Sequence, residues 1–183
     1  ADCVAGALLR GARGNSGVIL SLLFRGISRR LKGMETVGAK EFAAAMEDGV
    51  DAAYKAVMKP AEGTILTVAR MASAAAVEYA RKGTDIEELL ETALRIGNEA
   101  LENTVNQNPV LRKAGVVDAG GKGYIIIFTA MLAYLRGEVK APTAAVQAGV
   151  IANENNAFDM FGTDEITYAF DTVYIVRKHE PNV

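Results

Sequence analysis

The chain has 183 residues, half of them hydrophobic, which is enough to build one sizeable core. Its 20 basic and 22 acidic residues leave a net charge of −2, and no basic stripe with interleaved aromatic residues occurs, which argues against nucleic-acid binding as the main role. No apolar stretch is long enough to span a bilayer and the first residues lack the pattern of a signal peptide, so we expect no transmembrane segment and a cytoplasmic location.

The segment GARGNSG, residues 11–17, places three glycines at three-residue intervals before an apolar run that predicts a helix over 15–32. Backbone N–H groups in a first helical turn lack intrahelical partners, and the helix dipole is positive there, so such a turn suits a phosphate. Asn15 and Ser16 add side-chain donors. The segment lacks the Lys-Ser/Thr of a Walker A loop. In the alternative interpretation, the small residues only let two helices cross closely.

The next predicted helices cover 39–58 and 64–81, with a turn over 33–38 before the first and Pro60 ending it. The first of these helices repeats apolar residues at steps of three and four, namely Phe42, Met46, Val50, Ala53 and Val57. Residues 59–67, KPAEGTILT, form a second glycine segment at a helix start. Its alternative interpretation is ordinary N-capping by Thr64.

The sequence TDIE, residues 84–87, predicts a capping box with Thr84 as N-cap and Glu87 reaching back. The helix that follows repeats Ile86, Leu89, Leu90, Ala93, Leu94, Gly97 and Leu101 on one face. A short helix over 108–113 is expected because Pro109 fits a first helical turn.

A third glycine segment, GVVDAGGKG over 115–123, is expected to form a turn before another helix, with N-capping by Asp118 as the alternative. Residues 124–135 are apolar nearly all round, which predicts a buried central helix. The pattern up to Gly137 therefore predicts an all-α antiparallel helical bundle with short loops. Beyond it, 166–176 alternates like a strand, so we expect a helical domain over 1–140 and, over 141–183, a linker and the start of a second, truncated domain with β structure.

Four segments together closely resemble the DAK2, or DhaL-like, domain, and specifically the ATP-binding subunit of bacterial fatty acid kinase in the dihydroxyacetone kinase L-subunit superfamily. They are GARGNSGVILSLLFRG (11–26), AYKAVMKPAEGTILTVAR (53–70), AGVVDAGGKGY (114–124) and FDMFGTDEITYAF (158–170). The resemblance covers nearly the whole chain. It implies a DhaL-like bundle or barrel of antiparallel helices with the nucleotide at one end.

The resemblance also implies a function: the parent protein transfers the γ-phosphoryl group of ATP to a fatty acid carried by a DegV-type binding protein. The residues expected to bind the nucleotide are Gly14, Asn15, Ser16, Gly17, Gly63, Thr64, Asp118 and Gly120. Gly14, Asn15, Ser16 and Gly17 would bind the phosphates. Gly63 and Thr64 would contact phosphates or ribose, and Asp118 and Gly120 would line the nucleotide pocket. No catalytic residue is assigned, because a carboxylate acceptor is already deprotonated near neutral pH.

One departure from the family concerns the metal. The family's Asp-rich turn, which holds two Mg²⁺ ions, is expected upstream of Cys3 and has no counterpart in these residues, so no metal ligand is assigned. The chain is then either a fragment, inactive alone, of an ATP- and Mg²⁺-dependent phosphotransferase, or a degenerate paralogue. The alternatives are a dihydroxyacetone-type kinase subunit and a non-catalytic helical nucleotide-binding or interaction module. A homodimer is compatible with the sequence.

Overall fold

The computed structural model describes residues 2–138, and their fold is all-α. The helices are α1 (Asp2–Gly11), α2 (Gly14–Leu31), α3 (Ala39–Ala56), α4 (Ile65–Ala80), α5 (Ile86–Gln107), α6 (Pro109–Ala114) and α7 (Ala119–Leu135). No strand occurs between residues 2 and 138. The predicted helical bundle is thereby confirmed, whereas the expected strand and second domain over 141–183 lie outside the described residues.

Several helices begin where a side chain accepts a hydrogen bond from a free backbone N–H group of the first turn. The Thr64 hydroxyl accepts from the N–H of Leu66 and caps α4, and Asn108 caps α6 with Pro109 in its first turn. The capping box predicted at Thr84 is wrong. Asp85 is the N-cap of α5 instead, because its carboxylate accepts from the N–H groups of both following glutamates, at 2.7 and 3.0 Å.

The start of α7 also differs from the prediction. The GGKG sequence is not a turn before the helix but its first helical residues, since α7 begins at Ala119. The Asp118 carboxylate stabilises this start by accepting from the N–H of Gly121 at 2.7 Å, and the burial of Gly121 and Tyr124 adds to the stabilisation. These contacts outweigh the low helix propensity of glycine.

Helix α7 is also less buried than its composition suggests. Tyr124, Phe128 and Leu132 lie in the core, but Ile126 and Tyr134 on the other side are 56% and 58% exposed within the described part of the chain. The prediction of a helix buried all round is therefore wrong for one face. The faces predicted for α3 and α5 are confirmed, with only Val57 and Ile86 partly buried.

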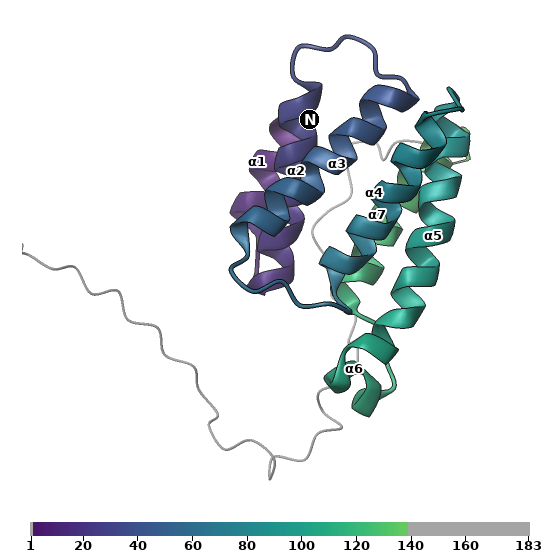
Figure 1. Cartoon of the computed structure of the whole chain (residues 1–183). Helices are drawn as coiled ribbons and strands as arrows, with labels where there is room; N and C mark the ends of the chain where they lie inside the picture. The colour runs from purple at the N-terminus through teal and green to yellow at the C-terminus, as the bar shows by residue number, and fades with distance from the viewer. Residues whose placement is uncertain (1, 139–183) are drawn as a thin grey trace, which may run out of the picture. The chain divides into compact units, whose positions relative to one another are not determined.

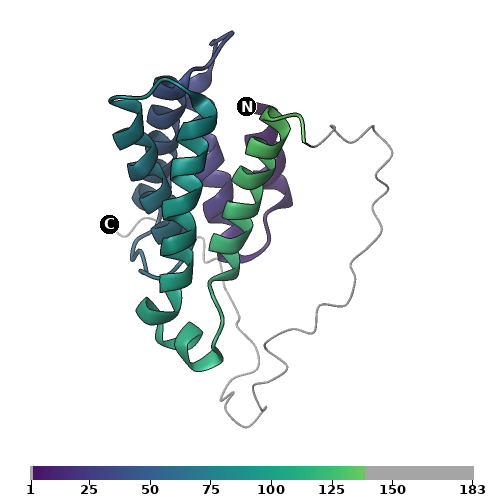
Figure 2. The ribbon, with the colours of Figure 1, turned by 90° about the vertical axis from the view of Figure 1, so that its right-hand side faces the viewer.

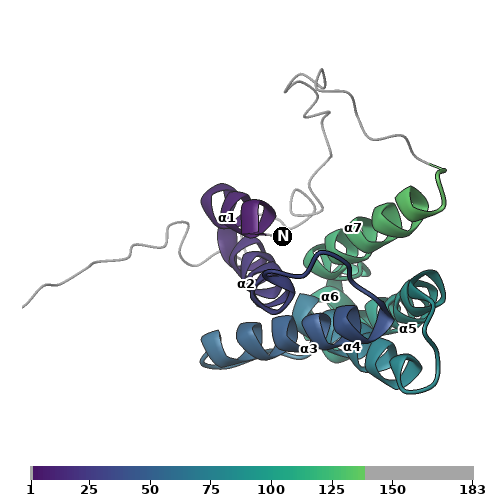
Figure 3. The same ribbon diagram turned by 90° about the horizontal axis from the view of Figure 1, so that it is seen from above.

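Neighbouring helices run in opposite directions. Helices α1, α3 and α5 run toward one end, and α2, α4 and α7 run back from it (Figure 1). Each of the first five helices packs against the next, and α7 returns to pack against α4 and α5 and to touch α2 (Figures 2 and 3). Consequently α2, α4 and α7 all begin at the same end of the bundle.

Glycines stand where the helices approach most closely. A Cβ atom built at Gly26 would lie 2.5 Å from the carbonyl oxygen of Asp48 and from the Cα of Gly49, so α2 and α3 touch backbone to backbone. In the other half, a Cβ at Gly97 would lie 2.7 Å from Ile125. These crossings set the spacing of the core around them.

Among residues 2–138, no helix is both long enough and apolar enough to cross a membrane.

Replacing Gly26 with alanine should destabilise the fold by about 1–3 kcal/mol, because the added methyl group must displace backbone atoms of α3. Urea denaturation followed by circular dichroism measures this. The matched control is Gly123→Ala in α7, where a Cβ would meet nothing within 4 Å and helix propensity should raise stability by about 0.5–1 kcal/mol. Equal effects of the two substitutions would contradict the close crossing.

Candidate functional site

The start of α2 differs from the other helix starts that follow a glycine segment. Arg13 occupies the N-cap position in an extended conformation and makes no side-chain capping bond. Gly14 follows with φ of +63°, a left-handed conformation that favours glycine. The first turn has no acidic residue, and Gly14, Asn15 and Ser16 are exposed. The turn is thus exposed and its backbone N–H groups have no side-chain cap, as an anion-binding helix start requires.

Two glycines of the GARGNSG segment stand in open space within residues 2–138, since a Cβ atom at Gly11 or Gly14 would meet nothing within 4 Å. The atoms nearest to a Cβ at Gly17 belong to Ala12 in the preceding loop, at 3.3 Å and beyond, and not to another helix. Close helix crossing uses Gly26 and Gly49 instead. The contacts therefore favour the interpretation of an exposed backbone over that of a packing device.

The start of α7 lies against the start of α2. A Cβ at Gly120 would be 3.1 Å from both Cβ and Oγ of Ser16 and 3.3 Å from Oδ2 of Asp118. Asp118 is fixed in turn, because its N–H donates to the Thr104 hydroxyl at 3.1 Å while its carboxylate caps α7. Ser16, Asp118 and Gly120, three of the predicted residues, are therefore brought together from two distant parts of the sequence.

The start of α4 lies at the same end of the bundle, packed against the junction of α5 and α6. Gly63 is buried with φ of +74°, and a Cβ there would lie 2.9 Å from Cβ of Gln107 and 3.0 Å from the backbone N of Asn108. Its N–H donates to the Thr67 hydroxyl at 2.9 Å. The Thr64 hydroxyl donates to the carbonyl of Ala61 at 2.8 Å besides capping α4. The side chains of Thr64 and Asp118 thus act as helix caps, and nucleotide contact at Gly63 and Thr64 stays a prediction.

A group of polar residues beside Gly63 was not predicted. Arg70 of α4 bonds to Glu62 at 2.9 Å and to the hydroxyl of Tyr54 in α3 at 3.1 Å. Glu62 also accepts from the Thr67 hydroxyl at 2.8 Å. These residues come from α3, the loop before α4 and α4 itself, and meet only in the folded chain. The sequence shows a glutamate and an arginine eight residues apart, which is no signal for pairing in a helix.

The described residues do not supply a site for Mg²⁺. Between residues 2 and 138 no group of three or more Asp, Glu, His or Cys side chains could hold a metal ion. Hard divalent cations need several oxygen ligands, so the Mg²⁺ implied by the resemblance does not fit these residues.

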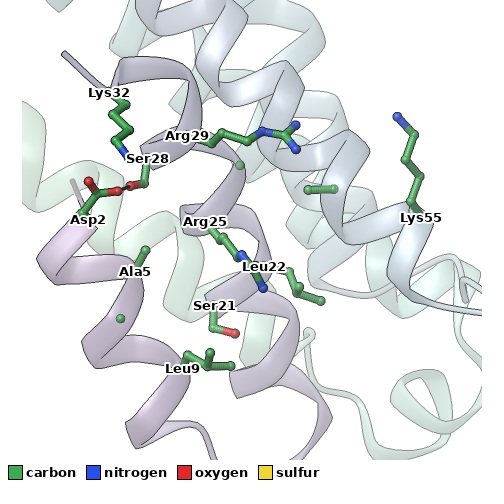
Figure 4. A pocket seen from close by; sticks show the side chains of 13 residues that line it. Asp2, Ala5, Leu9, Ser21, Leu22, Arg25, Ser28, Arg29, Lys32 and Lys55 are labelled. Atoms are coloured by element: carbon green, nitrogen blue, oxygen red, sulfur yellow. Dashed lines mark hydrogen bonds between the residues drawn. The ribbon is translucent and has the colours of Figure 1, made fainter. Parts of the chain in front are cut away.

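Two larger cavities lie away from the glycine segments. One, of about 660 Å³, opens between α1, α2 and α3, and its lining includes four basic residues, Arg25, Arg29, Lys32 and Lys55 (Figure 4). Asp2 is the only acidic residue in its lining and accepts from the Ser28 hydroxyl at 2.6 Å. The other, of about 690 Å³, is a groove over α4 and α5. Neither lining includes a residue predicted to bind the nucleotide.

Comparison with known families gives one clear match. The family model described as the DAK2 domain matches residues 1–133.

Comparison with curated proteins finds bacterial relatives. An uncharacterized protein of Staphylococcus saprophyticus is 48% identical over 172 residues, 93% of this chain and 31% of the relative. Protein YloV of Bacillus subtilis is 47% identical over 174 residues, 93% of this chain and 32% of the relative. An uncharacterized protein of Staphylococcus epidermidis is 42% identical over 172 residues, with 93% and 31% covered. The chain spans about a third of the length of these relatives.

Replacing Asp118 with alanine should lower stability by about 0.5–2 kcal/mol, because the N–H of Gly121 loses its acceptor at the start of α7. Thermal or urea denaturation measures the loss. Asp118→Asn is the control, since an amide oxygen also caps helices well and should retain most of the stability. If alanine and asparagine were equally destabilising, the carboxylate would act by its charge and not as a cap.

Proposed function

The chain belongs to the DAK2 domain family, and on this premise we propose that it is the ATP-binding domain of a kinase that phosphorylates fatty acids to acyl phosphates. DAK2 domains belong to kinase systems and bind nucleotides, which supports the nucleotide-binding part of the proposal. The fatty acid substrate and its DegV-type carrier rest on the sequence resemblance. The cytoplasm, where ATP is available, is the proposed location.

The observation that carries the proposal is the open start of α2. Its N–H groups have no side-chain cap, its glycines pack against no other helix in the described part of the chain, and its first turn carries no acidic residue. A phosphate placed there would gain hydrogen bonds from the backbone and a favourable interaction with the helix dipole. We assign phosphate binding to Gly14, Asn15, Ser16 and Gly17.

The neighbouring helix starts would form the walls of the nucleotide pocket. Gly120 contacts Ser16 directly, so a phosphate at α2 would lie next to the first turn of α7. Asp118 holds that turn in place by capping it. Gly63 and Thr64 would approach the phosphates or ribose from the start of α4.

In the proposed reaction, a carboxylate oxygen of the acceptor bonds to the γ-phosphorus of ATP while the bond to the bridging oxygen breaks and ADP leaves. The acceptor is already an anion near neutral pH, so positioning and charge neutralisation matter more than proton removal. Because residues 2–138 hold no metal-binding group, we assign the Mg²⁺ ligands to a part of the parent protein outside them. This chain alone is then expected to bind nucleotide without transferring the phosphoryl group.

The double substitution Asn15→Ala with Ser16→Ala should weaken ATP binding about tenfold or more, because hydrogen bonds to a charged group are lost. Isothermal titration calorimetry of the whole chain with ATP measures this, and circular dichroism should show unchanged helix content. The control pair Thr84→Ala with Asn98→Ala also removes one hydroxyl and one amide, but away from the glycine segments. Unchanged affinity in the Asn15 and Ser16 variant would overturn the phosphate assignment.

The affinity of this chain for ATP should also change little, less than about threefold, when Mg²⁺ is replaced by EDTA. The reason is that the described residues offer no three-ligand group for the ion. The same titration in the two buffers checks this. A strong Mg²⁺ requirement would mean that residues outside 2–138 of this chain hold the ion.

A further inference from the structure

Four side chains connect α3, the loop before α4, and α4 itself in a continuous hydrogen-bonded network. The Arg70 guanidinium donates from one nitrogen to the hydroxyl of Tyr54 and from another to Oε2 of Glu62. The same Glu62 oxygen accepts from the Thr67 hydroxyl, and that hydroxyl accepts from the N–H of Gly63. The network therefore runs from a charged side chain on α4 to the backbone of the glycine turn.

The inner part of this network is buried and the outer part is not. Thr67 is 2% exposed, whereas the side chains of Arg70 and Glu62 are 43% and 53% exposed. An exposed ion pair by itself adds little to stability. Here, however, the ion pair fixes the carboxylate that orients a buried hydroxyl, and the hydroxyl satisfies a buried N–H group that would otherwise lack a partner.

The network holds Gly63 in a backbone conformation that favours glycine. Gly63 has a left-handed φ of +74° and lies against the end of α5, with no room for a side chain. The next residue, Thr64, must then be extended so that its hydroxyl can cap α4. Rotation of the peptide at Gly63 would break both the bond to Thr67 and the cap.

We infer that Arg70 is a positioning residue of the nucleotide site, which holds Glu62 in place and, through Thr67, fixes the Gly63–Thr64 turn that faces the nucleotide. This inference rests on the proposed function, because it concerns the same site. It differs from a direct contact between Arg70 and a phosphate. The guanidinium already donates to Tyr54 and Glu62, and its hydrogen bond to the Tyr54 hydroxyl, more than that to Glu62, raises the pKa of Arg70.

A double-mutant cycle on ATP affinity tests the inference. Glu62→Ala and Arg70→Met should each weaken ATP binding by about three- to tenfold, and the double variant should be no weaker than the weaker single variant, because both remove the same chain of contacts. Glu62→Gln should recover most of the affinity, since its amide oxygen can still accept from Thr67 and Arg70. The matched control is Arg81→Met, which breaks the Arg81–Glu78 ion pair at the other end of α4.

A second measurement reports on the Gly63–Thr64 turn in the absence of nucleotide. Amide hydrogen exchange of Gly63, followed by NMR without nucleotide, should accelerate in Glu62→Ala and Arg70→Met and stay unchanged in Arg81→Met. Only the first two remove the Glu62 carboxylate, or the ion pair that holds it against the Thr67 hydroxyl.

The outcomes distinguish the inference from the proposed function. A wild-type chain that fails to bind millimolar ATP overturns the proposed function and this inference with it. Wild-type binding with unchanged affinity in both single variants overturns the inference alone. Effects that multiply in the double variant, or tighter binding in Glu62→Ala from the loss of a negative charge near the phosphates, also overturn it.

Discussion

The contact on which the rest of this structure depends is the backbone-to-backbone approach of helices at glycine. Helices α2 and α3 touch at Gly26 and Gly49, where no side chain could fit without moving the opposite backbone. At Gly97 and Gly121 the close neighbours are side chains of α4, α5 and α7 and not backbone atoms. Since protein interiors are packed as densely as organic crystals, these crossings fix the positions of the helices closely. The alternating direction of the helices puts the starts of α2, α4 and α7 at one end, and the close crossings hold these helices near one another there.

The helix starts at that end are not equivalent. Helices α4 and α7 begin with side-chain caps, from Thr64 and Asp118, so their first N–H groups are partly satisfied. Helix α2 begins after a left-handed glycine and has no such cap. In the proposed site, a phosphate would therefore bind at the helix start without a side-chain cap, with two capped helix starts at the same end of the bundle. This difference, and not the number of glycines, makes GARGNSG the centre of the proposed site.

The proposed chemistry divides between this chain and other parts of its parent protein. Residues 2–138 offer backbone donors for phosphates but no cluster of carboxylates for a metal ion. Relatives such as protein YloV are about three times as long as the matched region. On the proposed function, this domain would bind the nucleotide, and the ion pair of Glu62 and Arg70 would hold the Gly63–Thr64 turn in place. Charge neutralisation and delivery of the acceptor are then tasks for other segments and a partner.

The sequence by itself determined helices α2 to α6, because apolar periodicity and turn residues act over a few neighbouring residues. Helix α1 was not predicted, and the start of α7 was predicted at 124 instead of Ala119. The sequence correctly indicated the buried faces of α3 and α5. The prediction of Thr84 as the N-cap of α5 was wrong by one residue, since both Thr84 and Asp85 can cap a helix and only the path of the chain makes Asp85 the cap. Three other features depend on how the helices pack. They are the exposure of Ile126, the closeness of Ser16 to Gly120 and the pairing of Glu62 with Arg70. Only the tertiary structure decided these, because side chains distant along the chain meet through geometry that no local pattern encodes.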